Sequence, residues 1–402
     1  MWLYLITNQL YVAAIWIASF FSSKAKKAIQ GRMDFFEKHP VSDQSYIWFH
    51  CSSLGEFEQG RPLIEKLKEH FPEKKILLSF FSPSGYEMRK NYNGADKVVY
   101  LPFDSSSNAK KFIHTFKIEK AIFIKYDVWP WYVKELQENK IPVYLVSSLF
   151  RKNQFYFKWY GSFYQKLLKK LDGIFVQNAE SLEVATNHGF TNVHVAGDMR
   201  IDRVIAIKNN STGIERIEEF LKGRKAIVCG SVYPAEIELI KSIVNHLLPD
   251  EKLIIAPHNT DAGTVTFFMQ QIPNAISFEK WNESSASQVM VIDHIGSLSR
   301  IYKYASSVYV GGGFGRSIHN ILEPAVYGVP VFFGPNFSRF PEARQFINSE
   351  IGFSDTDQPA LADKIISSRQ INPQKTRHNS EQWFFENSGA TQLIFNSIFF
   401  YN

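Results

Sequence analysis

Short apolar runs alternate with helix-like segments through most of the chain. In the first half, the apolar runs predict strands at Tyr46–His50, Lys75–Phe80, Lys97–Leu101, Lys120–Lys125, Val143–Val146, Gly173–Gln177 and Val193–Ala196. Segments in which apolar residues recur at helical spacing predict helices at Gly60–His70, Ser107–Phe116, Trp129–Glu138 and Ala179–His188. Strands that alternate with helices in this way are typical of a parallel sheet with helices on both faces.

The same alternation resumes after a polar, turn-rich stretch at residues 209–213. It predicts further strands at Ala226–Cys229, Lys252–Ala256, Val289–Ile292, Val308–Gly311 and Val331–Phe333. We therefore expect two Rossmann-like, doubly wound α/β domains, at residues 24–208 and 209–402. Ligands of such folds bind at the carboxyl ends of the strands, so the pattern predicts a cleft between the two sheets. The aromatic, helix-like segment Ser380–Asn402 belongs to the second domain in this scheme, but its pattern also suits packing back on the first.

The N-terminal segment carries the longest apolar span. Trp2–Phe21 is close to the roughly 20 residues that cross a bilayer as a helix. Lys24, Lys26 and Lys27 follow it, so the positive-inside rule predicts an anchor at residues 1–23 and a body at the cytoplasmic face of the inner membrane. Polar residues near its middle and interfacial aromatic residues keep two alternatives open: a helix that lies in the membrane interface, and a buried first helix.

The charge balance and the cysteine count of the chain exclude some classes of function. The chain has 402 residues, with 45 basic and 39 acidic side chains and a net charge of +6. This excess is too diffuse for a nucleic-acid binder, but it suits an anionic substrate or an anionic membrane surface. Two cysteines, Cys51 and Cys229, provide neither a disulfide framework nor a cysteine-rich zinc site.

The most informative motif is GGGFGRSIHNILEPAVYGVPVFFGP, residues 311–335. Its glycines follow a predicted strand and allow a ligand to approach the backbone closely. We expect a helix to begin at His319–Asn320, with Glu323 in its first turn. A glycine turn followed by a helix N-terminus favours phosphate, and a carboxylate one turn further on can accept hydrogen bonds from a ribose. The alternative is an ordinary strand–turn–helix connection.

Several motifs in one order carry a resemblance to a known family. They are Ser53–Glu56, Ser82–Gly85, Tyr100–Asp104, Trp129–Pro130, Gly197–Asp202, Gly230–Ser231 and the glycine block with its His-Asn-x-x-Glu-Pro sequence. With the apolar N-terminus, they resemble the 3-deoxy-D-manno-octulosonic acid (Kdo) transferases. This resemblance implies a glycosyltransferase-B fold and transfer of Kdo from CMP-Kdo to a lipid A precursor, lipid IVA, in lipopolysaccharide core biosynthesis. It also implies that no metal or other cofactor is used, that the enzyme sits on the inner membrane, and that nucleic acid is not a partner.

The resemblance also assigns the catalytic residues. It implies that Glu56 is the general base of a single inverting displacement, although a Glu in a first helical turn is also favoured by the helix dipole. Glu58 is the nearby competitor. Asp127 stands where the family has Glu and is implied to hold the reacting centre, and it also suits an N-cap. Arg200 stands where the family has Lys; it is implied to stabilise phosphate or carboxylate, with a solvated surface arginine as the alternative.

The resemblance places CMP-Kdo on a set of residues from the second half. They are Gly230, Ser231, Pro257, His258, Ile295, Gly296, Ser297, Gly312, Gly313, His319, Asn320, Ile321, Leu322 and Glu323. Two positions depart from the family: the Arg between Pro257 and His258 is missing, and Ser297 replaces a Glu. From the residues alone, His319 also fits a packed core histidine.

The acceptor side offers one candidate segment. Residues 151–170, RKNQFYFKWYGSFYQKLLKK, are rich in aromatic and cationic side chains, which suits lipid acyl chains and phosphates. A core helix with a basic solvated face is the alternative.

Two other functions of the whole protein also stay open: a UDP-sugar enzyme (a glycosyltransferase or a UDP-N-acetylglucosamine 2-epimerase), and a membrane-tethered binding protein without catalysis. An epimerase needs neither an anchor nor a base at a Gly-Glu turn.

Overall fold

The chain folds into two compact units. The computed structural model describes residues 2–125 and 127–400, with side chains from residue 4 onward. Unit 1 comprises Met1–Arg203 and Asn387–Asn402, and unit 2 comprises Val204–Glu386. Residue 1 of the expected anchor and residues 401–402 lie outside the described residues, as does the side chain of Trp2.

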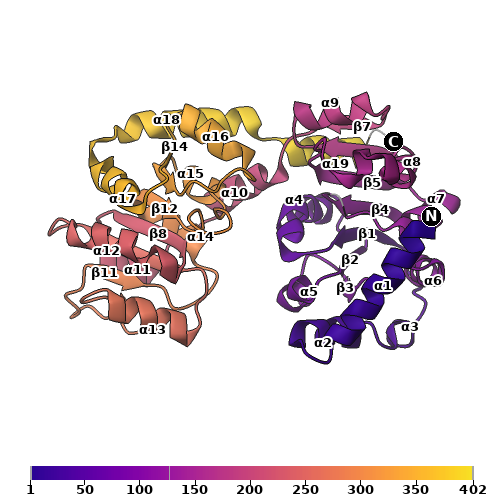
Figure 1. Ribbon diagram of the computed structural model, residues 1–402, viewed down its shortest axis with the longest axis horizontal. Coiled ribbons are helices and arrows are strands. Elements are labelled where there is room, and N and C mark those ends of the chain that lie inside the picture. Colours follow the sequence, from indigo (N-terminus) through magenta and orange to yellow (C-terminus); the bar gives the residue numbers. More distant parts are fainter. Residues whose placement is uncertain (1, 126, 401–402) are drawn as a thin grey trace. The chain divides into compact units, whose positions relative to one another are not determined.

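Unit 1 is built on a seven-stranded parallel sheet (Figure 1). The strand order is β3-β2-β1-β4-β5-β6-β7. The strands are β1 Tyr46–Cys51, β2 Ile76–Phe80, β3 Lys97–Tyr100, β4 Ile118–Ile124, β5 Val143–Ser148, β6 Gly173–Val176 and β7 Val193–Val195. Every residue of β1 is buried, as expected for the centre of a sheet that helices cover on both faces.

Alternate residues of these strands supply two separate cores. Trp48, Leu77 and Phe123 pack with α6, α7 and α9 on one face, whereas Phe49 and Ile122 pack with α4 and α19 on the other. The helices of unit 1 are α1 Trp2–Ala18, α2 Ser23–Gln30, α3 Phe35–Lys38, α4 Leu54–His70, α5 Pro83–Arg89, α6 Ser106–Phe116, α7 Pro130–Glu138, α8 Ser162–Leu168, α9 Ala179–Asn187, α10 Met199–Asn209 (which continues into unit 2) and α19 Ala390–Phe399.

Unit 2 repeats the arrangement with the order β10-β11-β9-β8-β12-β13-β14, all parallel. The strands are β8 Ala226–Val232, β9 Lys252–Pro257, β10 Ile276–Ser277, β11 Val289–Val291, β12 Ala305–Val310, β13 Val331–Phe333 and β14 Gly352–Ser354. The helices are α11 Glu215–Leu221, α12 Ile237–Asn245, α13 Ala262–Gln271, α14 Leu298–Ile301, α15 Leu322–Ala325, α16 Pro341–Asn348, α17 Gln358–Ser367 and α18 Pro373–Asn387. Helices α12, α13 and α17 share one core with the sheet.

The predicted α/β class with two parallel sheets is confirmed, and every strand that the apolar runs predict overlaps an observed one. The pattern missed β10 and β14, which have two and three residues and lie at the edges of the second sheet. Each of them contains a single large apolar residue, Ile276 or Phe353, so neither forms an apolar run that could be recognised.

The N-terminal span is not one continuous helix. Helix α1 ends at Ala18 after 17 residues, and α2 begins after Ser22, whose hydroxyl accepts the N–H of Ala25. Within residues 2–125 and 127–400, no single helix is both long and apolar enough to cross a bilayer. The helices Tyr4–Ala18 and Ser23–Gln30, which are bent at 118° to each other, are long and apolar enough only when they are taken together.

Helix α1 turns polar side chains toward the body of unit 1. The hydroxyl of Tyr4 donates to the Asp104 carboxylate, and the Asn8 amide donates to the Asp104 carbonyl at 2.6 Å. Its opposite face leaves large apolar side chains exposed, and so does the turn that follows it: Ile6, Leu10, Trp16, Ile17, Phe20 and Phe21. We call this the outer face of α1.

The C-terminal segment divides between the units. The predicted continuous helix is two helices, α18 and α19, separated at Gly389, whose φ of +99° favours glycine. The Asp202 carboxylate accepts the N–H groups of Gly389 and Thr391, each at 2.7 Å, and so caps α19. Helix α19 thereby returns to unit 1, where its yellow ribbon lies among purple elements in Figure 1.

Candidate functional site

Glu56 lies in the first turn of α4, directly after the central strand β1. Its Oε2 accepts the N–H groups of Ser52 at 2.6 Å and Ser53 at 3.2 Å, and the Ser53 hydroxyl accepts the N–H of Glu56 at 3.4 Å. This is a capping box, which fixes the carboxylate rather than leaving it to solvent. The spacing of Ser53 and Glu56 carries this signal in the sequence. The side chain is nevertheless almost entirely buried.

Asp127 brings a second carboxylate to Glu56. It follows β4, the neighbour of β1 in the sheet, and its side chain hydrogen-bonds that of Glu56. Burial raises the pKa of Glu56 well above the ordinary carboxyl range, and the nearby Asp127 charge raises it further. Burial also raises the pKa of Asp127. Two buried carboxyl groups in contact favour sharing a proton, so the pair is poised for proton transfer near neutral pH.

The cation Lys125 lies close to both carboxylates of the pair. The ammonium of Lys125 opposes the rise in the pKa of Glu56, and burial lowers the pKa of Lys125 itself. Arg200 also interacts with Lys125, but its guanidinium is bound to its own neighbour: Nε and an Nη donate to Asp198 Oδ2 at 2.8 and 2.6 Å. Sequence reasoning missed Lys125 and Asp198; the proximity of Asp198 and Arg200 in sequence was the available signal.

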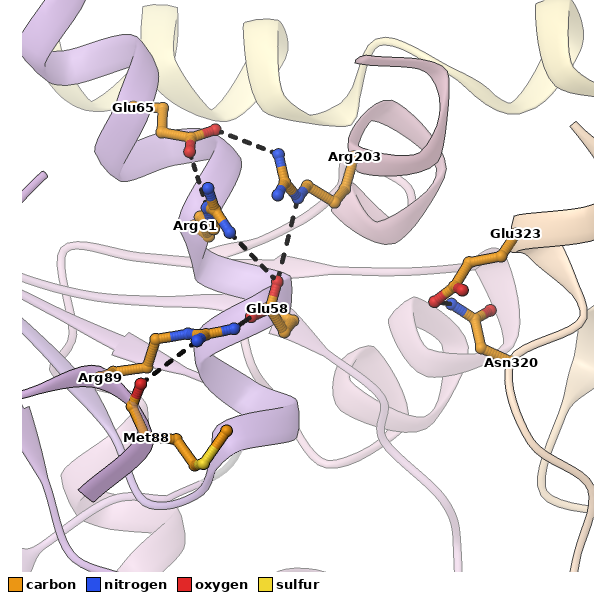
Figure 2. A network of polar contacts seen from close by, with 8 residues as sticks. All are labelled: Glu58, Arg61, Glu65, Met88, Arg89, Arg203, Asn320 and Glu323. Atoms are coloured by element: carbon orange, nitrogen blue, oxygen red, sulfur yellow. Dashed lines mark hydrogen bonds and ion pairs between the residues drawn. The ribbon is translucent and has the colours of Figure 1, made fainter. Parts of the chain in front are cut away.

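Glu58, the competitor for the role of base, is engaged elsewhere. Its carboxylate accepts a hydrogen bond from Arg89 at 2.7 Å and lies 3.9 Å from both Arg61 and Arg203 (Figure 2). Arg61 and Arg203 also contact Glu65. Three arginines therefore surround this half-exposed carboxylate, and each contact directs it toward a cation rather than toward Asp127.

In unit 2 the glycine block follows β12 and is held by a glutamate that the sequence reasoning missed. Glu236 is fully buried, and its carboxylate accepts the N–H of Gly312 at 2.8 Å, the N–H of Tyr233 at 2.9 Å and the hydroxyl of Tyr309 at 2.6 Å. The Gly312 N–H that was expected to cradle phosphate is therefore occupied within the protein. Gly312 has a φ of +90°, and an added Cβ at Gly313 would meet Gly334 at 2.6 Å, so both positions require glycine.

The His-Asn-x-x-Glu-Pro sequence forms less helix than expected. Helix α15 begins at Leu322, not at His319, and is a single turn. The reason is Pro324, which lacks an N–H and is tolerated only in the first turn of a helix. Asn320 occupies the position before it: its Oδ1 accepts the N–H of Leu322, and its Nδ2 donates to Glu323 at 3.0 Å (Figure 2). Ile321 and Leu322 are buried, so their side chains belong to the core.

His319 joins a stack of three rings. Its ring lies 4.4 Å from that of His258 and 5.6 Å from that of Tyr233, whose hydroxyl is 3.0 Å from His319 Nε2. Burial lowers the pKa of His319 to about 4, so the ring is neutral at pH 7. The stack joins two residues predicted to bind the donor with one that was not predicted, Tyr233.

The remaining predicted donor residues follow or end neighbouring strands. Gly230 and Ser231 lie within β8 rather than after it, because β8 continues to Val232, and Pro257 ends β9. The segment Ile295–Ser297 follows β11; Ile295 is exposed, whereas the buried Ser297 hydroxyl has no partner among the described residues. The order β11-β9-β8-β12 puts these positions and the glycine block at one edge of the sheet.

Residues 151–170 divide between core and surface. Tyr156, Phe157, Leu167 and Leu168 are buried, whereas Trp159 is 90% exposed and Tyr160 is 53% exposed. Exposed cations, Arg151, Lys152 and Lys158, lie among them in sequence. Tyr4 of α1 contacts the rings of Phe163 and Tyr164, so this segment adjoins α1.

In the described part of the chain, no group of three or more His, Cys, Asp or Glu side chains is arranged to hold a metal ion.

Comparison with known proteins shows which proteins the chain is similar to. Residues 27–203 match the family model of the 3-deoxy-D-manno-octulosonic-acid transferases (kdotransferases). The chain is 28% identical over 339 residues to the 3-deoxy-D-manno-octulosonic acid transferase of Aquifex aeolicus, covering 82% of this chain and 88% of that protein. It is 23% identical over 317 residues to the transferase of the same name from Rickettsia bellii, covering 75% of this chain and 74% of that protein.

A crystal structure of UDP-N-acetylglucosamine 2-epimerase has a similar fold, with a TM-score of 0.61 and 13% identity over 90% of this chain and 96% of that chain. At this identity the likeness shows the two-sheet, glycosyltransferase-B-like fold alone. The matches to the relatives are longer than either unit, and the family model covers nearly all of unit 1 beyond α1. The chain is therefore similar to the 3-deoxy-D-manno-octulosonic acid transferases over most of its length.

Proposed function

We propose that this protein is an inverting glycosyltransferase that moves Kdo from CMP-Kdo to a lipid A precursor, lipid IVA, in lipopolysaccharide core biosynthesis. The observation that carries the proposal is the buried Glu56–Asp127 pair at the end of β1 and β4. A transferase needs a base that is neutralised by a proton from the acceptor hydroxyl, and a carboxylate with a raised pKa is a stronger base than an ordinary one. Similarity to this family supplies the class of reaction, and this pair supplies a base for it.

Glu56 takes the acceptor proton in the proposed step. The acceptor oxygen attacks the anomeric carbon of Kdo while its proton passes to Glu56, and the bond from that carbon to the CMP phosphate breaks with both electrons leaving on the phosphate. Because Ser52 and Ser53 hold Oε2, the proton goes to Oε1. One displacement inverts the anomeric configuration. Asp127 keeps the pKa of Glu56 high, and the cations Lys125 and Arg200 offset the negative charge of substrate groups.

CMP-Kdo is assigned to unit 2. The loop ends after β8, β9, β11 and β12 share one sheet edge, and there the Tyr233–His258–His319 stack offers aromatic faces. Glu323, already oriented by Asn320, is proposed to accept hydrogen bonds from the ribose hydroxyls. Glu236 is given no contact with CMP-Kdo, because its carboxylate already accepts hydrogen bonds from Tyr233, Tyr309 and Gly312.

We also propose that α1 attaches the protein to the cytoplasmic leaflet of the inner membrane by lying in the interface. A helix of 17 residues is about 25 Å long, which is short of a hydrocarbon core of about 30 Å. Tyr4 and Asn8 bind Asp104 of the body, while the outer face of α1 is exposed. The exposed Lys24, Lys26 and Lys27, with Trp159 on the adjoining segment, suit an anionic lipid surface.

The central experiment measures transfer of radiolabelled Kdo from freshly generated CMP-Kdo to tetraacyl lipid A precursor in detergent with EDTA. Wild type is expected to form product, the number of sugars is counted by mass spectrometry, and NMR of the new linkage reports inversion. Glu56→Gln should be nearly inactive. Absence of transfer combined with tight binding of UDP-sugars would overturn the proposal in favour of a UDP-sugar enzyme.

Attachment is tested separately by flotation with vesicles of phosphatidylethanolamine and phosphatidylglycerol. Ile17→Ser, on the outer face of α1, should weaken binding several-fold by removing buried apolar area. Leu248→Ser, an exposed apolar residue of unit 2, is the matched control and should bind as wild type does. Equal binding of all three proteins would contradict attachment through α1.

A further inference from the structure

We propose that His50 is a positioning residue that ties the two arms of the carboxylate pair together through Trp129 and Ser52. Here an arm is the short segment that follows a strand and carries one carboxylate: residues 52–56 after β1, and residues 127–130 after β4. This inference rests on the proposed function, because it assigns His50 a part in setting the geometry of Glu56 and Asp127.

The contacts of His50 reach both arms. It lies in β1, is fully buried, and its Nε2 accepts the indole N–H of Trp129 at 2.9 Å. The same Nε2 lies 3.2 Å from the Ser52 hydroxyl, and the backbone N–H of Ser52 makes the shortest hydrogen bond to Glu56. Trp129 is two residues from Asp127. One imidazole therefore contacts a residue in each arm.

The partners of His50 determine its protonation. An indole N–H can only donate, so Nε2 must be the unprotonated nitrogen and Nδ1 must carry the proton. Nδ1 then donates to the Ser79 hydroxyl at 2.8 Å, and that oxygen also accepts the indole N–H of Trp48 at 2.7 Å. A proton on Nε2 of His50 would point at the indole N–H of Trp129, so two donors would face each other without an acceptor. The neutral ring with Nδ1–H is the only form that satisfies all of these contacts.

The Trp129 arm has little freedom to move on its own. The Trp129 ring stacks on Phe81 at 4.5 Å, and the Asp104 carboxylate accepts the N–H groups of Trp131 and Tyr132 at the start of α7. Releasing the indole from His50 removes a side-chain hydrogen bond that connects this arm to β1. Asp127 would then drift from Glu56, and its effect on the pKa of Glu56 would weaken.

The test compares Trp129→Phe with Trp383→Phe. Trp129→Phe keeps the stacking on Phe81 but deletes the donor; Trp383→Phe deletes an equivalent indole hydrogen bond, to Gln345 at 3.0 Å, in unit 2. We expect Trp129→Phe to lower kcat about tenfold with KM for both substrates unchanged. The acid limb of its pH–rate profile should move to lower pH, because Glu56 loses the influence of Asp127 while Lys125, Arg200 and Asp198 remain. Trp383→Phe should keep the wild-type profile.

Two substitutions of His50 test its role: His50→Gln should preserve the link between the arms, and His50→Phe should remove it. A glutamine can accept from Trp129 through Oε1 and donate to Ser79 through Nε2, so it should retain most of kcat. His50→Phe should match Trp129→Phe, and the double variant should show no further loss, because both changes remove the same contact. Equal profiles of Trp129→Phe and Trp383→Phe, or additive losses in the double variant, would overturn the proposal.

A second readout needs neither activity nor a variant protein that folds. In wild type labelled with ¹⁵N-histidine, His50 should show a protonated Nδ1 and an unprotonated Nε2 that stay unchanged from pH 5 to 9. An Nε2–H tautomer, or titration in that range, would contradict the assignment. If wild type transfers no Kdo but shows the expected tautomer, the proposed function fails while the buried linkage of the two arms stands.

Discussion

Two buried glutamates, one in each unit, share a local design but differ in what faces them. Glu56 and Glu236 each begin a helical segment and each accept two backbone N–H groups. Burial raises the pKa of both. Around Glu236 the partners are all donors: Tyr233, Gly312 and the Tyr309 hydroxyl. Glu56 instead faces a second carboxylate, Asp127.

This difference separates a structural carboxylate from a reactive one. The donors around Glu236 hold its carboxylate in place and oppose the rise in its pKa, and the carboxylate in turn holds the glycine loop. When two carboxyl groups face each other, the state in which one of them is protonated is favoured. That proton can then be transferred during a reaction. Burial and a perturbed pKa alone therefore do not identify the base; the identity of the facing group does. Replacing each glutamate by glutamine tests this reading.

The largest expected effect is on catalysis by Glu56→Gln. The amide oxygen can accept the N–H groups of Ser52 and Ser53 as Oε2 does, and the NH₂ can donate to Asp127, so the site keeps its hydrogen bonds but loses its base. We expect kcat to fall by at least about 10²-fold, the contribution of a general base. Steady-state transfer assays on the variant and on Glu236→Gln give the comparison. Residual activity within tenfold of wild type would exclude Glu56 as the base.

Glu236→Gln should act on stability instead. A glutamine offers only one oxygen, so its NH₂ must face the N–H of either Tyr233 or Gly312, and a buried donor is left unsatisfied. We expect unit 2 to lose about 1–3 kcal/mol. Urea denaturation followed by circular dichroism measures the loss, and amide exchange at Gly312 should report the same opening. Wild-type stability with a large loss of turnover would reverse the roles given to the two glutamates.

Asp127→Asn should move the pH dependence of the reaction. Glu56 is active when deprotonated, so kcat falls as pH drops through its pKa. The Asp127 charge raises that pKa, and its removal lowers it, so the acid limb of the profile should shift to lower pH. The plateau should fall several-fold, because a weaker base takes the proton less readily. The matched control is Asp96→Asn, an ion-paired surface position of unit 1, whose profile should equal that of wild type.

The smallest effect concerns stability as a function of pH. The folded pKa of Glu56 lies above its unfolded value, so the native state binds more protons and wild type loses stability as pH rises from the ordinary carboxyl range through the raised pKa. Glu56→Gln does not titrate and escapes this loss. The difference in unfolding midpoint should therefore favour the variant increasingly from pH 4 to pH 9. A constant difference would mean that the pKa of Glu56 is not raised in the folded protein.

The strand positions and the place of Glu56 could be predicted from the sequence. Continuous apolar runs marked the central strands, and Gly55-Glu56 at the end of one run put a carboxylate at the sheet edge. The short helix α15 shows why a local sequence pattern can predict the wrong start of a helix. His319 and Asn320 suit a helix start, but Pro324 allows the helix to begin only shortly before it.

The partners of the site residues were beyond sequence reasoning. His50 and Trp129 lie 79 positions apart, and Glu236 and Gly312 lie 76 apart. The apolar run of β1 marks His50 as buried but does not say which side chain it contacts. In the same way, the sequence did not show that the N–H of Gly312 donates to Glu236, which comes from a different part of the chain.

The return of α19 to unit 1 has a consequence for how the chain is made. Ala390, Ile394, Phe395 and Ile398 complete the core that covers Phe49 and Ile122, although some 190 residues of unit 2 and its flanks are synthesised in between. Domains generally fold in order as they leave the ribosome. Here that order is broken, because one face of the first sheet stays incompletely covered until α19 has been synthesised. Premature termination anywhere in unit 2 thus damages the fold of the part already made.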